Sequence, residues 1–398
     1  MRTALLVAAL AASTVIGVVV GAQGPGMRGG TRIQAGQECP PGTTETRPGN
    51  CQAPQDPAPS ILDYRPRSTL VTTEHKVPKA RFPSIDFHGH PPSLTTPGGI
   101  ERVVAAMDPL NLKVMVVANN MSGASLASTV AAINASPHKG RFRVLGGVDF
   151  RDVGAGWADK AVAQLQADVK AGALGVGEVG KGFGLDIRKR DGSRLKIDDP
   201  ELDPLWREFA RLDVPAFIHT AEPPEFFEPM DTKNERWLEL ALFPSRRNNG
   251  PDDPKFETLM TERNALFRRH PKTRFVAAHF GWHAMDLGRA AKLLDEFPNV
   301  MLEAGAVLYD FGRQPRGSHD FFVKYQDRIL FGKDAFEPNE YPYYWRVFET
   351  TDEYFDYYRG YHAFWKLYGM GLPDAVLKKL YYANALKTLK MPTAGWPQ

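Results

Sequence analysis

Two histidines flank a single glycine in the segment Asp86-Phe87-His88-Gly89-His90. Alternate residues of a β-strand point to the same side, so both imidazoles can face one point and bind one divalent metal ion. Asp86 lies two residues earlier on the same face, where its carboxylate could accept a hydrogen bond from a ligand ring. His88 and His90, the HxH pair, are only moderately specific by themselves. They indicate a metal centre if other segments supply further ligands.

Later segments place side chains of ligand type where predicted strands end, at His219, His279 and Asp334. A lone buried histidine is usually a satisfied core residue, and an aspartate after a strand often caps a helix. Because the C-terminal ends of parallel strands meet at one mouth of a barrel, four such ends with ligand types indicate a shared site. Nitrogen and carboxylate ligands with open positions suit Zn²⁺ and are compatible with Mn²⁺ or Fe²⁺.

Glu178, at the end of another predicted strand, leaves two arrangements open. If it faces inward, its carboxylate bridges two ions, one bound by the HxH pair and Asp334, the other by His219 and His279. If it points elsewhere, one ion is bound by the HxH pair, His219 and Asp334, and His279 polarises the substrate carbonyl. The sequence does not decide between them.

Eight parallel strands are needed to bring these residues together. From residue 84 onward, short apolar, β-branched segments alternate with segments of helical spacing. Eight strands separated by helices over about 250 residues predict a (β/α)₈ TIM barrel, which we assign to residues 81–398 together with C-terminal helices. The predicted strands are 84–88, 113–118, 143–150, 174–179, 214–219, 274–279, 300–304 and 329–334. The predicted helices are 99–107, 124–133, 155–171, 204–211, 255–269, 286–296 and 319–325.

A long loop, 220–253, follows the fifth predicted strand. Long loops in compact domains are usually functional or disordered, and this one leaves the strand end where barrel active sites lie. We therefore interpret it as a lid or specificity loop rather than a surface insertion.

The aromatic-rich segment 341–382 is interpreted as helices packed on the barrel, with a few rings near Tyr341 able to face the substrate.

The N-terminal region is typical of an exported protein. Arg2, an apolar run and small residues up to Ala22 predict a signal peptide over 1–22, with an uncleaved anchor as the alternative. Residues 23–80 form a predicted Pro/Gly-rich irregular arm. Because the periplasm and the exterior are oxidising, we expect a disulfide between Cys39 and Cys51. We therefore expect a periplasmic or secreted protein without a membrane span after signal cleavage.

The composition excludes several classes of protein. Among 398 residues, 49 basic and 46 acidic side chains give a formal charge of +3. This small excess does not indicate the strongly basic surface that binds nucleic acid. Two cysteines exclude a disulfide scaffold and a cysteine-based zinc module. Hydrophobic residues at 43% and charged residues at 24% are ordinary for a globular enzyme. A small-molecule substrate is the expected partner, and a homo-oligomer is compatible with the sequence.

From about residue 84 to 390 the chain resembles the amidohydrolase superfamily. More narrowly, it is similar to the branch that contains aminocarboxymuconate-semialdehyde and resorcylate-type decarboxylases and several lactone hydrolases. The resemblance is carried by the ligand pattern and by residues 197–200, 217–223, 312–315, 326–332 and 371–373. It implies a deformed (β/α)₈ barrel with metal ligands at the HxH pair, His219 and Asp334, and a polarising or metal-binding role for His279.

Two departures accompany the resemblance, one in the eighth strand and one in the fourth, where many relatives carry a lysine within the strand and this chain aligns around Glu178 and Lys181. Family members often read Gly-Thr-Asp at the eighth strand, whereas this chain reads Gly332-Lys333-Asp334. The strand at Glu178 also resembles the Gly-Glu-hydrophobic-Gly strand of TatD-type nucleases, whose glutamate binds metal, and this favours the two-metal arrangement.

The expected chemistry is attack of metal-activated water on a carbonyl or related electrophile. Asp334 would accept the water proton and later protonate the leaving group, and His279 or a second ion would stabilise the oxyanion. Arg313 is a candidate for binding a substrate carboxylate, with Lys181 and Glu303 as weaker candidates for substrate contact. We therefore predict an exported metal-dependent hydrolase of an amide, ester or lactone. The alternatives are a metal-dependent decarboxylase of a small carboxylated aromatic or enoic acid, and a non-enzymatic binder.

Overall fold

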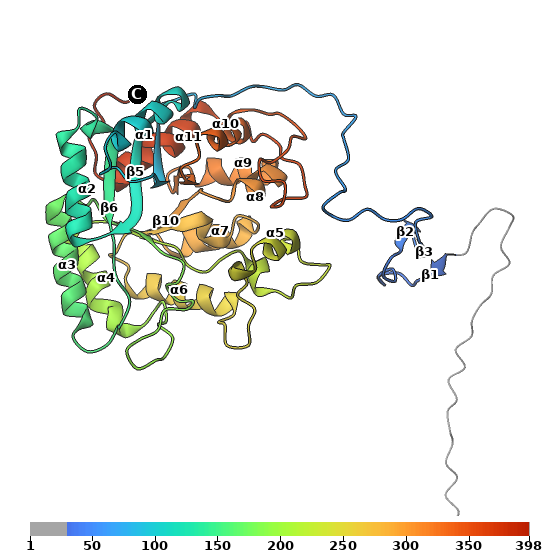
Figure 1. Ribbon diagram of the computed structural model, residues 1–398, viewed down its shortest axis with the longest axis horizontal. Helices are drawn as coiled ribbons and strands as arrows, with labels where there is room; N and C mark the ends of the chain where they lie inside the picture. The colour runs from blue at the N-terminus through green and yellow to red at the C-terminus, as the bar shows by residue number, and fades with distance from the viewer. Residues whose placement is uncertain (1–29, 398) are drawn as a thin grey trace, which may run out of the picture. The chain divides into compact units, whose positions relative to one another are not determined.

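The computed structural model describes residues 30–397, so the predicted signal peptide lies outside the described residues. The chain forms two compact units that divide between Leu70 and Val71 (Figure 1). The first contains an antiparallel sheet of order β1-β3-β2, built from β1 (Thr31–Arg32), β2 (Thr44–Arg47) and β3 (Asn50–Gln52). Strands this short bury little apolar surface. The predicted disulfide between Cys39 and Cys51 is confirmed, and it closes a loop across this sheet.

The second unit is a parallel barrel, which confirms the predicted fold class. Its sheet runs in the order β11-β10-β9-β8-β7-β6-β5-β4-β12. The eighth predicted strand is broken into β11, which pairs with β10, and β12, which pairs with β4, so this one segment closes the sheet. The strands are β4 (Ser84–His90), β5 (Leu112–Met121), β6 (Phe142–Gly146), β7 (Val176–Val179), β8 (Ala216–Ile218), β9 (Phe275–Ala277), β10 (Val300–Glu303), β11 (Ile329–Leu330) and β12 (Asp334–Ala335).

Helices cover the outside of the sheet, and α2, α3 and α4 lie side by side on one flank (Figure 1). Their apolar faces point inward, as in α4, whose Trp206 stacks on Phe209 at 5.7 Å and packs against Phe275 of β9 at 5.8 Å. Asp286 begins α7 by accepting the N–H of Arg289 at 3.0 Å. The helices are α1 (Gly99–Met107), α2 (Gly123–Ala135), α3 (Trp157–Ala171), α4 (Asp203–Leu212), α5 (Trp237–Leu242), α6 (Phe256–Arg269), α7 (Leu287–Glu296), α8 (Leu308–Arg313), α9 (Pro315–Lys324), α10 (Tyr341–Glu349), α11 (Asp374–Lys378) and α12 (Asn384–Thr388). Within the described part of the chain, no helix has both the length and the apolar character that crossing a membrane requires.

The loop after β8 is ordered by contacts with the segment between α10 and α11. Phe243 of the loop packs on Tyr361 with ring centroids 5.5 Å apart. The aromatic residues of α10 pack against the barrel as the sequence predicts. However, Tyr341 is fully buried and its hydroxyl donates to Asp86 Oδ2 at 2.5 Å, so this ring does not face a substrate.

Candidate metal centre

The HxH pair lies at the C-terminal end of β4, and each ring is held through its Nδ1 atom. His88 Nδ1 lies 3.0 Å from Glu303 Oε2, and His90 Nδ1 lies 3.0 Å from Asn119 Oδ1. A carboxylate and an amide oxygen only accept hydrogen bonds, so each Nδ1 carries a proton and each Nε2 is the nitrogen that can offer a lone pair to a metal ion. The two Nε2 atoms nevertheless lie 3.1 Å apart. Facing lone pairs repel, and a cation between them removes the repulsion, so this geometry fits a metal ion.

Glu178, at the end of β7, occupies the centre of the cluster. Its Oε2 lies 3.3 and 3.4 Å from the Nε2 atoms of the HxH pair. Its Oε1 lies 2.7 Å from His219 Nδ1 and 3.2 Å from His279 Nε2. Asp334 Oδ1 lies 3.8 and 3.5 Å from the HxH pair's Nε2 atoms. Each oxygen of one carboxylate therefore faces a different pair of imidazole nitrogens, which is the inward orientation that the sequence left open.

The second pair of imidazoles has the same donor chemistry as the first. His279 Nδ1 donates to the carbonyl oxygen of Gly305 at 3.0 Å, which leaves a lone pair on its Nε2. His219 has a carboxylate oxygen near each nitrogen, Glu178 Oε1 at 2.7 Å from Nδ1 and Glu222 Oε2 at 3.6 Å from Nε2, and a cation that binds at Nδ1 leaves the proton on Nε2. His219 Nδ1 and His279 Nε2 are 3.1 Å apart beside Glu178. Three acceptors thus converge, and nitrogen and carboxylate donors of this kind suit a divalent cation.

Burial and charge act in opposite directions on the carboxylates of the cluster. Burial opposes ionisation of Glu178, but His88 and His219 outweigh it and hold the pKa of Glu178 well below its usual range. For Asp334, burial also raises the pKa, but the greater effect of His88 and His279 lowers it. The cluster therefore keeps both carboxylates ionised and requires positive charge beside them. Protons or metal cations can supply that charge, and a metal ion that binds displaces the protons.

Unusual backbone conformations aim these side chains into the site. The chain turns left-handed from His279 (φ 52°) to Trp282 (φ 54°), directly after β9, and Asp334 adopts φ 79°. Non-glycine residues avoid this region unless the surrounding structure enforces it, and such strain concentrates at functional sites. Glu303 Oε2, which holds the His88 ring, also accepts the backbone N–H of His279 at 3.1 Å. One buried carboxylate therefore sets the positions of a ligand from each pair.

The structure brings all six predicted metal ligands into this cluster, but it places other predicted site residues elsewhere. Glu303 is fully buried beneath the cluster, so it orients ligands rather than contacting substrate. Arg313 does not line the pocket that opens onto the cluster. It pairs instead with Glu235 at 2.9 Å and Asp310 at 2.8 Å. Asp86 accepts the backbone N–H groups of His88 and Lys333 instead of a ligand ring.

A pocket of about 370 Å³ opens onto the cluster. Lys181 lines it and pairs with Glu222 at 3.0 Å, and its contact with substrate stays a prediction. The long loop contributes several residues to its wall. Sequence reasoning missed part of the lining, because these residues come from loops, single turns and short helices whose position over the barrel mouth is set by tertiary contacts. They are Glu222, Pro223, Phe226, Arg236, Glu239, Arg246, Trp282, Tyr309, Arg359 and His362.

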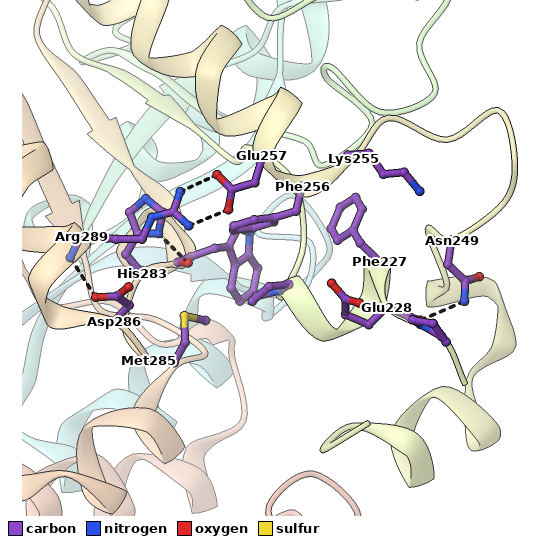
Figure 2. Close-up of a pocket in the computed structure, with 13 residues that line it drawn as sticks. Phe227, Glu228, Asn249, Lys255, Phe256, Glu257, His283, Met285, Asp286 and Arg289 are labelled. Carbon is purple, nitrogen blue, oxygen red and sulfur yellow. Dashed lines mark hydrogen bonds and ion pairs between the residues drawn. The ribbon is translucent and has the colours of Figure 1, made fainter. Parts of the chain in front are cut away.

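A neighbouring pocket of about 640 Å³ shares Trp282 with the first. Figure 2 shows Phe227 and Phe256 at this pocket and Arg289 bonded to both oxygens of Glu257. His283, another lining residue, accepts from Arg263 through its Nε2 atom at 3.1 Å. Arg289 and Glu257 thus pair with each other here, and the metal-ligand types converge in the smaller pocket.

Comparisons with known proteins agree with this architecture. A family model described as amidohydrolase matches residues 85–391. No curated protein matches the chain. An uncharacterised TIM-barrel protein from Bordetella bronchiseptica is 17% identical with a TM-score of 0.49, covering 77% of this chain and 98% of its own. The 2,6-dihydroxybenzoate decarboxylase from Rhizobium is 17% identical with a TM-score of 0.46, covering 77% and 98%. A dihydroxybenzoic acid decarboxylase from Polaromonas sp. JS666, determined with manganese and 2-nitroresorcinol, is 16% identical with a TM-score of 0.48, covering 77% and 96%.

Proposed function

Because the chain belongs to the amidohydrolase family, we propose that it is a metal-dependent hydrolase whose two divalent cations share Glu178. The observation that carries the proposal is the position of this carboxylate, with one oxygen facing the HxH pair and the other facing His219 and His279. Such cations, when bound, lower the pKa of a water and polarise a carbonyl, which is the chemistry of hydrolysis. Zn²⁺ suits the donor set, with Mn²⁺ or Fe²⁺ as alternatives.

Asp334 is the proposed proton acceptor. Its side chain is 35% exposed, lies beside the HxH pair and lines the pocket, so its carboxylate reaches both the cluster and a bound substrate. Neighbouring positive charge keeps it ionised and able to accept a proton from attacking water. It can return this proton to the leaving group, as a general base that then acts as a general acid. The substrate class is a small amide, ester or lactone.

We propose export from the sequence features at the N-terminus, with a periplasmic or secreted location. The confirmed disulfide supports an oxidising compartment.

Metal analysis of the purified protein tests the proposal. We expect two ions per chain, falling to one or none in Glu178→Ala, because that change removes a ligand from both positions. Glu228→Ala is the matched control, since it removes a carboxylate that lines the neighbouring pocket. One ion per chain in both the wild-type protein and Glu178→Ala would refute the shared carboxylate. Hydrolysis is then followed with aryl esters and lactones in water labelled with ¹⁸O, and the ¹⁸O must appear in the carboxylate product.

Decarboxylation of a small carboxylated aromatic acid is the second candidate. It uses the same ligand types, and it is favoured by the basic side chain of Arg359 in the pocket wall, which can bind an acid substrate. The products separate the two reactions. A decarboxylase releases CO₂ and adds only a proton to its organic product, which carries no ¹⁸O from H₂¹⁸O, whereas the hydrolase leaves ¹⁸O in its carboxylate product.

A further inference from the structure

His362 belongs to the segment between α10 and α11 and lines the pocket that opens onto the metal centre. Only 5% of the residue is exposed. Its ring packs against Tyr309 with centroids 4.4 Å apart and against Tyr357 at 5.5 Å. The ring is therefore held in one orientation, and each of its nitrogens has a defined environment.

The Nε2 atom of His362 is occupied by Arg236 of the long loop. The Arg236 guanidinium is buried, its Nε donates to Glu239 Oε2 at 2.7 Å, and one of its Nη atoms contacts His362 Nε2. A guanidinium has donors and no acceptor, so His362 Nε2 must accept this hydrogen bond through its lone pair. Glu239 Oε2 lies 3.4 Å from the same nitrogen but is already satisfied by Arg236.

The proton of the neutral ring is consequently on Nδ1. Burial, reinforced by the positive charges of Arg236 and Arg359, holds the pKa of His362 well below its usual range, so the ring stays neutral. Within residues 30–397, Nδ1 has no hydrogen-bond partner. A buried N–H donor without an acceptor is unfavourable, and buried polar groups are paired in the great majority of structures. His362 lines the pocket, and because this atom exposes less than 1 Å², a ligand acceptor reaches it by displacing the side chains that cover it.

A positive charge adjoins this donor. The backbone N–H of His362 donates to the Arg359 carbonyl oxygen at 2.9 Å, so one turn presents both side chains to the pocket. The other basic side chains of the described lining are paired with acids of the same pocket, Lys181 with Glu222 and both Arg236 and Arg246 with Glu239. Arg359 instead pairs at 3.5 Å with Glu340, which lies outside the lining, and its other N–H groups can serve a ligand.

We propose that His362 Nδ1–H and Arg359 form a subsite for a carboxylate of the substrate, so that the preferred substrate carries a carboxylate apart from its reacting carbonyl. The neutral donor supplies direction and the guanidinium supplies charge, which together favour a carboxylate over an amide of the same shape. The inference rests on the proposed function in assuming that the reacting carbonyl lies at the metal centre.

Calorimetric titration of the metal-loaded protein with benzoate, isophthalate and 3-carbamoylbenzoate tests the subsite without requiring turnover. One carboxylate of each ligand can occupy the metal centre, and only isophthalate offers a second to the subsite. We expect isophthalate to bind at least about tenfold more tightly than the other two. Equal binding of all three by the wild-type protein, or binding of none, overturns the proposal.

Two substitutions of His362 then separate its two nitrogens. His362→Gln places an amide near the Nε2 position, where it can still accept from Arg236, and removes the Nδ1 donor, so the preference for isophthalate should fall about tenfold. His362→Asn places its amide nearer the Nδ1 position and should restore part of the preference. Tyr357→Phe, which alters a ring that contacts His362 but does not line the pocket, is the control and should keep the preference. An isophthalate preference in His362→Gln within twofold of the wild type refutes the role of His362.

Two further measurements keep the outcome interpretable. The metal content of every preparation is determined, because loss of the metal centre refutes the proposed function whereas an unchanged isophthalate preference refutes the subsite. If both His362 variants fail to fold, nitrogen NMR of the wild-type histidines decides the matter. An Nδ1–H tautomer of His362 whose signal moves with isophthalate supports the subsite, and an Nε2–H tautomer or an unmoved signal overturns it.

Discussion

Replacement of Glu303 by glutamine tests how the buried carboxylate beneath the cluster prepares the metal ligands. Glu303 Oε2 accepts from His88 Nδ1 at 3.0 Å and from the His279 backbone N–H at 3.1 Å, and Oε1 accepts the N–H of Gly305. The side chain is fully buried. Glutamine keeps the size of the side chain but exchanges one acceptor oxygen for an NH₂ group that only donates.

The size of the effect follows from the two orientations of the new amide. With its oxygen towards His88 and His279, the NH₂ group meets the N–H of Gly305, so one of the three donors that Glu303 serves loses its acceptor. The reverse orientation leaves two donors unpaired, so the first should dominate, at a cost of about 1–3 kcal/mol in folding stability. A neutral amide also makes His88 a weaker base, and loss of such an outer partner typically lowers metal affinity about 10- to 100-fold.

Competition with a chromogenic chelator measures the metal affinity, and denaturant unfolding measures the stability. Glu262→Gln is the matched control, because Glu262 is a buried carboxylate of α6 that pairs with Arg194 at 3.0 Å and lies outside the cluster. We expect the control to lose stability at unchanged metal affinity. If Glu303→Gln binds metal within twofold of the wild type, the proposed fixing of the His88 tautomer is wrong.

Three further predictions address the reaction, the packing and the pH dependence. Asp334→Asn should retain metal but slow hydrolysis about 10²- to 10⁴-fold, measured as kcat, because the amide cannot accept the proton; an unchanged kcat would exclude the assigned role. Gly332→Ala should destabilise the fold by about 1–3 kcal/mol in denaturant unfolding, since its Cβ would overlap Glu303 Oε1 and lie 2.7 Å from His88 Cβ; wild-type stability would show that the barrel relaxes there. Burial raises the pKa of Asp310 to about 7 from its ordinary 3.8. The folded protein therefore favours the protonated form, and the stability that this proton provides is present below about pH 4 and lost as the pH rises to about 7. Asp310→Asn should accordingly raise Tm more at about pH 8 than at about pH 4, and an equal change at both would contradict the assignment.

The barrel and the residue types of the metal cluster were predictable from local patterns. Apolar, β-branched segments end in His219, His279 and Asp334, and the ends of parallel strands must meet at one mouth. The eighth strand differs from its expectation. The sequence predicts one strand over 329–334, whereas the structure divides it into β11 and β12. Strand pairing with two different neighbours, which is a long-range property, decides where such a strand breaks.

Roles that depend on a partner far along the chain could not be read from spacing. Glu303 ends a strand, and from the sequence it is a candidate for contacting the substrate. In the structure its carboxylate instead holds the ring of His88, which lies 215 residues earlier in the chain. Arg313 resembles a carboxylate-binding residue, and its ion pair with Glu235 accounts for its charge instead. The function of an ionisable side chain depends on its neighbours, and a linear pattern identifies only those that are close in sequence.

The sequence by itself determined which residue types stand at the barrel mouth, because strand periodicity and parallel order are local and repetitive. Only the tertiary structure decided that Glu178 lies between the two histidine pairs, since its orientation depends on contacts with three other strands. The pocket wall was likewise decided by tertiary contacts. Arg236 and His362 lie 126 residues apart in irregular segments, and the hydrogen bond between them exists only once the barrel has brought both segments over the same site.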